Sequence, residues 1–139
     1  ASIRINGNAG NDQLNIISTA ALPLTEPATM TGGIGNDIMR GGNGSDSMFG
    51  NSGNDTMLGN IGNDVMSGGS GNDILLGGSG NDVLTGGVGV DQLRGEAGND
   101  VLLAADGGVD SVLDGGAGFD VVERDVFDAA AIGAEVVIV

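Results

Sequence analysis

The sequence predicts an all-β solenoid in which two parallel sheets of short strands face each other within a single domain over residues 1–139. A nine-residue unit, Gly-Gly-x-Gly-x-Asp-x-U-x with U a large apolar residue, repeats eight times without a gap over residues 32–103. A fixed short period of this kind is the signature of a repeat architecture. Each unit joins six turn-forming residues to three residues rich in Val, Ile, Leu and Thr. The chain is therefore expected to alternate tight turns with very short strands.

The last three positions of each unit are too short for a helix and match a strand with one inward side chain. One strand and one turn reverse the chain, so two units, or 18 residues, bring it back to its start. Successive coils then stack into two parallel sheets, with turns along both edges. The side chains predicted to point inward, from position eight, are Leu14, Met39, Met48, Met57, Met66, Leu75, Leu84, Leu93, Leu102, Val112 and Val122.

The repeat continues beyond the regular block. A detached copy covers residues 7–15, and two degenerate copies cover residues 104–123, with Ala104 and Asp114 as single-residue insertions between units. Residues 16–31 follow no period and contain both prolines of the chain, so they are expected to form an irregular insertion.

The composition indicates that this fold needs a cation. The chain has 19 acidic residues, four Arg, no Lys and no His, which gives a net charge of −15. Its core would consist of one aliphatic side chain per unit, and its many glycines make ordering the backbone costly. A thin core combined with strong self-repulsion predicts a largely disordered chain in the absence of metal.

Each unit has an Asp at position six, which supplies a carboxylate. Because alternate units share an edge, these carboxylates are expected to stack 18 residues apart in two columns. The first column contains Asp12, Asp37, Asp55, Asp73, Asp91 and Asp110, and the second contains Asp46, Asp64, Asp82, Asp100 and Asp120.

Calcium is the metal that suits such columns. It takes six to eight oxygen ligands from carboxylates and carbonyls, and glycine-rich turns expose carbonyls. Magnesium keeps several waters and requires octahedral geometry, whereas zinc and copper sites call for Cys or His, which the chain lacks. The sequence is also unlike an EF-hand, which needs a twelve-residue loop ending in Glu between helices. The alternative is a solenoid in which Asp merely caps turns.

This nonapeptide resembles the RTX (repeats-in-toxin), or hemolysin-type, calcium-binding repeat. The resemblance implies a right-handed parallel β-roll in which each ion lies between successive turns of one edge, held by two Asp residues and by backbone carbonyls. It implies about six to nine Ca²⁺ ions, whose total charge is close to the net charge of the chain. The candidate carbonyl ligands are Gly32, Gly35, Gly41, Gly44, Gly50, Gly53, Gly59, Gly62, Gly68, Gly71, Gly77, Gly80, Gly86 and Gly89.

Several function classes are excluded by composition. Without His, Cys or Lys the chain lacks Ser-His, Cys-His and Ser-Lys nucleophile pairs, so we expect no catalytic residue. Paired carboxylates could hydrolyse glycosides, but nearly every Asp belongs to the two columns. The net charge argues against nucleic acid, and the apolar runs are far too short for a membrane span.

The expected role is that of an extracellular bacterial module that folds on binding calcium, placed after an enzyme or adhesin domain. Cys is absent, so calcium takes the place of disulfides outside the cell. No secretory signal peptide is recognised at residues 1–8. The alternative is a free-standing structural or interaction protein that self-associates or binds a surface. Ice binding through the position-five Asn rows is a weaker variant of that alternative.

Two further features each have a structural and a functional interpretation. Residues 124–139 are expected to cap the last coil, and their acidic and then apolar end also resembles the export signal of type I secretion substrates. Outward Val and Leu rows, together with Phe49, either reflect strand propensity alone or form a docking face on a sheet.

Overall fold

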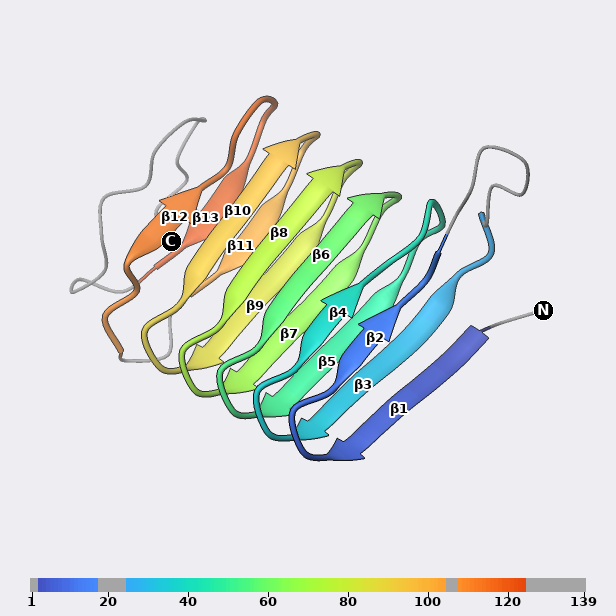
Figure 1. Cartoon of the computed structure of the whole chain (residues 1–139). Helices are drawn as coiled ribbons and strands as arrows, with labels where there is room; N and C mark the ends of the chain where they lie inside the picture. Colours follow the sequence, from blue (N-terminus) through green and yellow to red (C-terminus); the bar gives the residue numbers. More distant parts are fainter. Residues whose placement is uncertain (1–2, 18–24, 105–107, 125–139) are drawn as a thin grey trace.

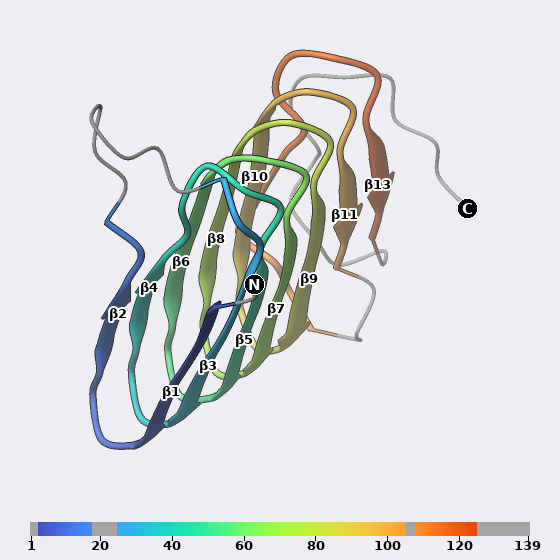
Figure 2. The same ribbon diagram turned by 90° about the vertical axis from the view of Figure 1, so that its right-hand side faces the viewer.

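The computed structural model describes residues 3–17, 25–104 and 108–124. Within these residues the regular secondary structure consists of strands, and these form two parallel sheets that face each other (Figure 1). Sheet A contains the odd-numbered strands in the order β1-β3-β5-β7-β9-β11-β13, and sheet B the even-numbered strands in the order β12-β10-β8-β6-β4-β2. Figure 2 shows the two layers side by side, joined by turns at both edges. The predicted all-β parallel roll is confirmed.

The strands are three to seven residues long. Sheet A is built from β1 (Ile3–Ala9), β3 (Ala28–Ile34), β5 (Ser47–Ser52), β7 (Val65–Ser70), β9 (Val83–Val88), β11 (Val101–Leu103) and β13 (Val121–Glu123). Sheet B is built from β2 (Gln13–Asn15), β4 (Ile38–Arg40), β6 (Thr56–Ile61), β8 (Ile74–Ser79), β10 (Gln92–Ala97) and β12 (Val112–Asp114).

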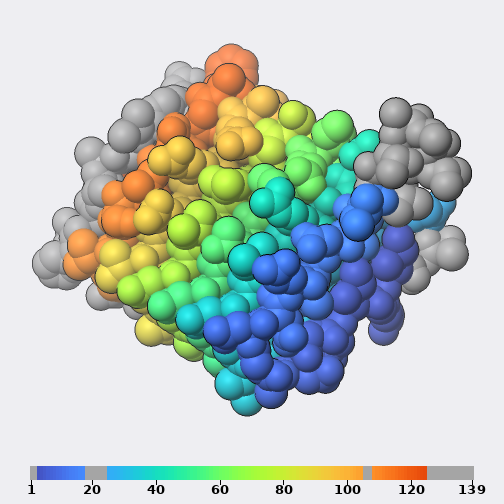
Figure 3. Space-filling model, viewed as in Figure 1, coloured from blue at the N-terminus to red at the C-terminus, as the bar shows by residue number. Residues whose placement is uncertain are grey.

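Strand register confirms that two repeat units make one coil. In the regular block each residue pairs with the residue 18 positions further on, as Met48 does with Met66 in sheet A and Met57 with Leu75 in sheet B. Because both sheets keep this register, position eight of every unit in the regular block faces inward, and positions seven and nine face outward. In the space-filling view the coils follow one another in sequence order, without a break (Figure 3).

The core is a column of single aliphatic side chains between the two sheets. The predicted inward residues are buried at ten of the eleven positions, and Met39, Met48, Met57, Leu75, Leu84, Leu93 and Leu102 have no exposed surface. Each such burial stabilises the fold by about 1.5–3 kcal/mol. With one such side chain per strand, the apolar core remains narrow.

The one remaining inward position, Val112, was predicted wrongly. Val112 is only half-buried and pairs with the outward Gln92, whereas Leu113 is fully buried and pairs with Leu93. The extra residue of this unit is Ser111, which directly follows the position-six Asp, and not Asp114, which lies inside β12. The chain has therefore accommodated its additional residue as a local bulge before the strand, which shifts the inward position by one.

The first coil begins earlier than the repeat pattern indicates. Strand β3 starts at Ala28, inside the stretch 16–31 that was expected to be irregular, and its Met30 is fully buried beside Met48. Ile5 of β1 pairs with Met30 and extends the core by one more layer. These strands follow the same alternation as positions seven to nine of the repeat, each directly before a glycine.

Candidate metal centre

Two columns of Asp side chains run along the edges of the roll, as the sequence predicts. On the edge where sheet A leads into sheet B (edge 1), the backbone N–H of Asp37 donates to Oδ1 of Asp55 at 2.8 Å, and Asp55 donates to Asp73 at 2.7 Å. On the opposite edge (edge 2), Asp46 and Asp64 are joined in the same way at 2.7 Å. We call these two columns the Asp ladder.

The Asp ladder includes every position-six Asp that was predicted as a ligand. Its bonds are 2.7–2.8 Å long and always run from the N–H of one coil to the carboxylate of the next coil. Edge 1 contains Asp12, Asp37, Asp55, Asp73, Asp91 and Asp110, and edge 2 contains Asp46, Asp64, Asp82, Asp100 and Asp120.

The second carboxylate oxygen is what makes the ladder a candidate metal site. The side chains from Asp37 to Asp120 are almost completely buried. Their Oδ1 atoms serve the backbone, but buried Oδ2 atoms remain without a hydrogen-bond partner at Asp12, Asp37, Asp55, Asp64, Asp73, Asp82, Asp100 and Asp120. A buried ionised oxygen is costly unless a cation, a donor or a proton satisfies it. Asp46 differs, because its Oδ2 accepts the N–H of Gly42 at 2.8 Å.

A backbone carbonyl of the next coil approaches the same place. A Cβ atom built on Gly7 would lie 2.6 Å from Asp12 Oδ2 and 2.7 Å from the carbonyl oxygen of Gly32. The same pair of oxygens, the Asp of the unit and the position-one carbonyl of the next coil, recurs around Gly50, Gly59, Gly68, Gly77 and Gly95. Position one must therefore be glycine, and the space that it leaves is bordered by hard oxygen atoms.

The predicted carbonyl ligands fall into two groups. Those at position one, such as Gly68 and Gly86, converge with the Oδ2 atoms. Those at position four, such as Gly35 and Gly53, point toward the position-four glycine of the next coil, where the Oδ1 atom of a position-five Asn also lies. Position-four glycines with positive φ, which include Gly35 and Gly53 but not Gly44, have φ values between +118° and +155°, which favour glycine.

Burial changes the protonation of the ladder. It raises the pKa of Asp64 to about 7, and the charges of Asp82 and Asp46 add to the rise, although the N–H donated by Asp46 opposes it. Burial likewise raises the pKa of Asp73 and of Asp100 to about 6. The pKa values of Asp55 and Asp82 shift upward for the same reason. These carboxyl groups need a counter-ion to stay ionised while buried.

Position five of the repeat forms a second ladder, which the sequence did not reveal. The N–H of Asn54 donates to Oδ1 of Asn36, and the N–H of Asn72 donates to Oδ1 of Asn54, both at 2.8 Å. This Asn ladder runs in the opposite direction to the Asp ladder, because here the later coil donates to the earlier one. Holding successive coils in register accounts for the recurrence of Asn at position five without any external ligand.

The arrangement limits which metal could be held. The described residues contain no group of three or more His, Cys, Asp or Glu side chains that could ligate one ion. Any ion at the ladder must therefore draw on one or two carboxylates and complete its shell with carbonyls or water. A hard cation with a large, flexible oxygen shell meets this condition, and calcium is such a cation.

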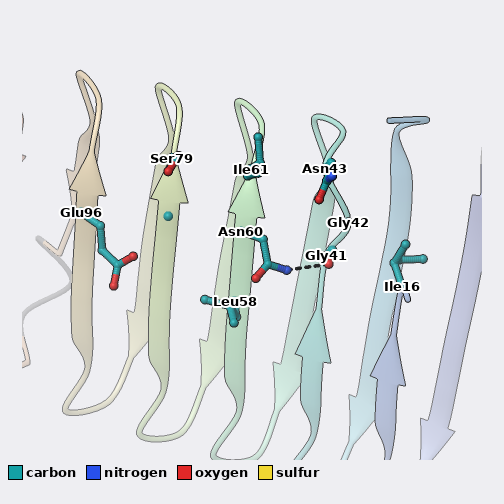
Figure 4. A pocket seen from close by; sticks show the side chains of 10 residues that line it. Ile16, Gly41, Gly42, Asn43, Leu58, Asn60, Ile61, Ser79 and Glu96 are labelled. Atoms are coloured by element: carbon teal, nitrogen blue, oxygen red, sulfur yellow. Dashed lines mark hydrogen bonds between the residues drawn. The ribbon is translucent and has the colours of Figure 1, made fainter. Parts of the chain in front are cut away.

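A separate hollow lies on the outer face of sheet B (Figure 4). It has a volume of about 410 Å³, and Glu96 is the one ionisable residue among those that line it. The Asn60 amide donates to the carbonyl of Gly41 at 2.6 Å on one wall. Glycoside hydrolysis requires two carboxylates, so this hollow lacks the groups for that reaction.

The fold and the ladders together define a class: a parallel β-solenoid with a column of buried carboxylates along each edge. A family model described as the RTX calcium-binding nonapeptide repeat matches residues 4–15, 31–66 and 67–102, which is more than half of the chain. The chain belongs to this family, and its repeats are calcium-binding repeats. The search of curated proteins and the search of solved structures found no match. No helix of the described residues is long and apolar enough to span a membrane.

Proposed function

We propose that this chain is a module that folds when calcium binds along the Asp ladder. The observation that carries the proposal is the set of buried Oδ2 atoms without a hydrogen-bond partner that recurs along both edges, as at Asp55 and Asp73 on edge 1 and at Asp64 and Asp82 on edge 2. With a net charge of −15 and a one-residue-wide core, the metal-free chain has little to offset the burial of these charges. Calcium supplies positive charge where those oxygens converge.

The ladder residues would hold the ions through Oδ2, together with the position-one carbonyl of the following coil. On edge 1 this set includes Asp55 with Gly68 and Asp73 with Gly86, and on edge 2 it includes Asp64 with Gly77. About six to nine ions over the two edges would neutralise most of the net charge. Calcium contributes a hard positive charge and a flexible oxygen shell, and the protein contributes the stacked carboxylates.

The role proposed for the folded roll is to stabilise, cap or help export a domain that precedes it in a secreted bacterial protein, an enzyme or an adhesin. Proteins with these repeats are typically secreted by bacteria into surroundings in which calcium is abundant. The chain contains no Cys that could form a stabilising disulfide there. The module itself is non-catalytic. A free-standing structural or interaction protein is the second candidate, supported by the uncharged outer face of sheet A described below.

The folding proposal is tested by titrating the metal-free chain with calcium and recording far-UV circular dichroism. We expect disorder in EDTA and a cooperative gain of β structure, with a midpoint on the order of 10⁻⁴ to 10⁻³ M as in extracellular calcium modules. Magnesium at the same concentration is the control and should leave most of the chain disordered. A chain that is fully folded in excess EDTA at neutral pH would falsify the proposal.

The placement of the module is tested separately. Reading the coding sequence on both sides of this segment shows whether a catalytic or adhesive domain is joined to it. If such a domain is present, its activity and thermal stability are compared with and without the roll at saturating calcium. Identical stability and export in both forms would remove the accessory role and favour the free-standing one.

A further inference from the structure

The outer face of sheet A differs from the rest of this acidic protein because the middle of this face carries no charged side chain. Among the described residues, the outward positions of its strands are occupied by small polar and apolar side chains from Thr29 to Leu103. The charged residues on this face are at its two ends, Arg4 on β1 and Glu123 on β13, and both are exposed. Although the net charge of the chain is −15, the strands between these two ends present no charged side chain on this face.

The middle of this face is apolar and partly open to solvent. Val65, Val83, Val101 and Val121 follow one another in register across four adjacent strands. Val65 is 45% exposed and Val121 is 37% exposed, and Phe49, one of three aromatic residues in the chain, is 39% exposed on β5. Contiguous apolar surface of this kind marks interaction sites on otherwise charged proteins.

Sheet B offers a poorer docking surface, although it also has large apolar residues. Its outward row at position nine reads Arg40, Leu58, Leu76 and Arg94, so charges interrupt the apolar stretch. Any partner that covered sheet B would have to bury these guanidinium groups or pair them, which costs free energy. The two faces of the same roll therefore differ in their suitability for docking.

We propose that sheet A packs against sheet A of a second copy of this chain, with the two rolls antiparallel along their long axes. A two-fold axis parallel to the strands places β1 of one copy over β13 of the other. By strand register, that arrangement places Arg4 of each copy over Val121 of its partner, two residues along β13 from Glu123 and within reach of the long Arg4 side chain, while Val65 meets its own counterpart. The alternative two-fold axis, along the roll, would bring the two Arg4 side chains together and is disfavoured by their repulsion.

A hollow at the end of the face supports this orientation. It has a volume of about 280 Å³ and is lined by Arg4, Ile5, Asn6, Thr29 and Thr31. In the antiparallel arrangement the β13 end of the second copy lies over it, so the Glu123 carboxylate of that copy lies over Asn6, where the neighbouring Arg4 guanidinium can pair with it.

The expected interface is small. Seven strands at about 4.8 Å spacing, with roughly three to six residues of about 3.3 Å each, give a face of roughly 300–600 Å² per copy. This is at the lower end of specific interfaces. We therefore expect a weak dimer that forms at high protein concentration, and only in calcium, because unneutralised copies repel each other.

The test is sedimentation velocity of the calcium-saturated chain over a range of concentrations, with circular dichroism to confirm that each variant is folded. Val83→Lys places a charge on β9, directly beside the central strand β7, and is expected to weaken the dimer about tenfold or more. Ile74→Lys, at position seven of sheet B, is the matched control and is expected to leave association unchanged. Both variants reduce the net negative charge, so general repulsion cannot explain a loss of association in one alone.

A charge swap tests the orientation of the two copies. Arg4→Glu and Glu123→Arg are each expected to weaken the dimer, and the double variant is expected to restore it. A chain that is monomeric at all concentrations overturns the proposal, as does a dimer that Ile74→Lys breaks and Val83→Lys does not. If Val83→Lys dissociates the dimer but the double variant is as weak as the single ones, the antiparallel arrangement is overturned.

Discussion

The regular middle of the roll and its two ends stack their coils through the same Asp ladder, but the number of residues between ladder partners differs. In the middle, ladder partners are 18 residues apart, as with Asp55 and Asp73. At the C-terminal end the separation grows to 19 between Asp91 and Asp110 and to 20 between Asp100 and Asp120. Between Asp12 and Asp37 at the N-terminal end it reaches 25.

The ladder bond itself does not change. The distance from the donor nitrogen to Oδ1 is 2.7–2.8 Å at all four of the separations found. Additional residues are placed in the segment after β2, in the segment before Asp110, or beside the strand at Ser111, and the Asp stays in its column. The position of the carboxylate, more than the spacing of nine, is what defines a coil of this protein.

The N-terminal end of edge 2 shows what happens when the Asp is missing. There Ala28 occupies the place of a position-six Asp and donates its N–H to Oδ1 of Asp46 at 2.7 Å. The backbone still follows the ladder, but Ala28 contributes no carboxylate to a metal. Edge 1 therefore extends one carboxylate further toward the N-terminus than edge 2 does, and we expect the ions of the two edges to differ at this end.

The largest effect is expected where a glycine is required by contact and not by its φ. In Gly68→Ala the new Cβ would clash with Asp73 Oδ2 and lie 2.6 Å from the carbonyl oxygen of Gly86, so the free energy of unfolding should fall by about 3 kcal/mol. Gly10→Ala is the control, because a Cβ there meets nothing within 4 Å and only its φ of +118° is unfavourable, at about 1 kcal/mol. Urea unfolding in saturating calcium measures both, and equal losses would contradict the crowded position-one geometry.

A somewhat smaller effect distinguishes the irregular C-terminal coil from the regular block. Leu113→Ala should lower the free energy of unfolding by about 2–3 kcal/mol, since Leu113 is fully buried, whereas Val112→Ala should cost less than about 1 kcal/mol. Thermal unfolding of the two variants in calcium compares them directly. A larger loss for Val112→Ala would restore the register that the spacing of nine alone predicts.

Position within the ladder should matter next. Asp73 accepts from Asp55 and donates to Asp91, whereas Asp120 is the last member of its column among the described residues. In Asp73→Ala the backbone N–H of Asp55 loses its acceptor between two ordered coils, which lowers the free energy of unfolding by about 1–3 kcal/mol. The coil of Asp120 is the last of its column and can fray, so the same loss costs less there. Calcium titrations should give a higher midpoint for Asp73→Ala than for Asp120→Ala. Equal midpoints would contradict this dependence on the position of the Asp within its column.

The smallest effect concerns the metal-free chain and pH. The pKa of Asp64 is raised to about 7, and those of Asp73 and Asp100 to about 6, whereas an unfolded Asp titrates near 3.8. Because the folded-state values are raised, protonation stabilises the fold fully below the unfolded value, and this stabilisation is lost as the pH rises through 6 to 7. Circular dichroism in EDTA should therefore show more β structure at pH 4.5 than at pH 7.5, and identical spectra would contradict the raised values.

Much of this architecture could be predicted from the repeat. Position eight fixed the core residues from Met39 to Leu102, and position six fixed both Asp columns, because a strict period leaves a single way to stack the coils. Strand β3 (Ala28–Ile34) was not predicted, because Ala28 occupies the position at which the pattern expects Asp. The bulge at Ser111 was missed because an insertion before a strand and one after it give the same spacing between glycines.

The different roles of the two carboxylate oxygens of each Asp could not be predicted from the sequence. A repeated Asp is equally compatible with a turn cap and with a metal ligand, whereas in the structure Oδ1 accepts an N–H from the preceding coil and Oδ2 stays buried at Asp55, Asp64 and Asp73. The Asn ladder was missed for a related reason, since Asn at position five has a sufficient local explanation as a turn residue.

The most direct test of the central claim is a crystal structure of the calcium-loaded chain, with the ions located by their anomalous scattering. The account predicts a file of ions along each edge, with the Oδ2 atoms of Asp55 and Asp73 on edge 1 and of Asp64 and Asp82 on edge 2 as ligands, at about 2.3–2.6 Å. Ions found only elsewhere, for example beside Glu96 in the hollow on sheet B, would contradict it. So would a fully ordered roll whose Asp ladder binds no ion in saturating calcium.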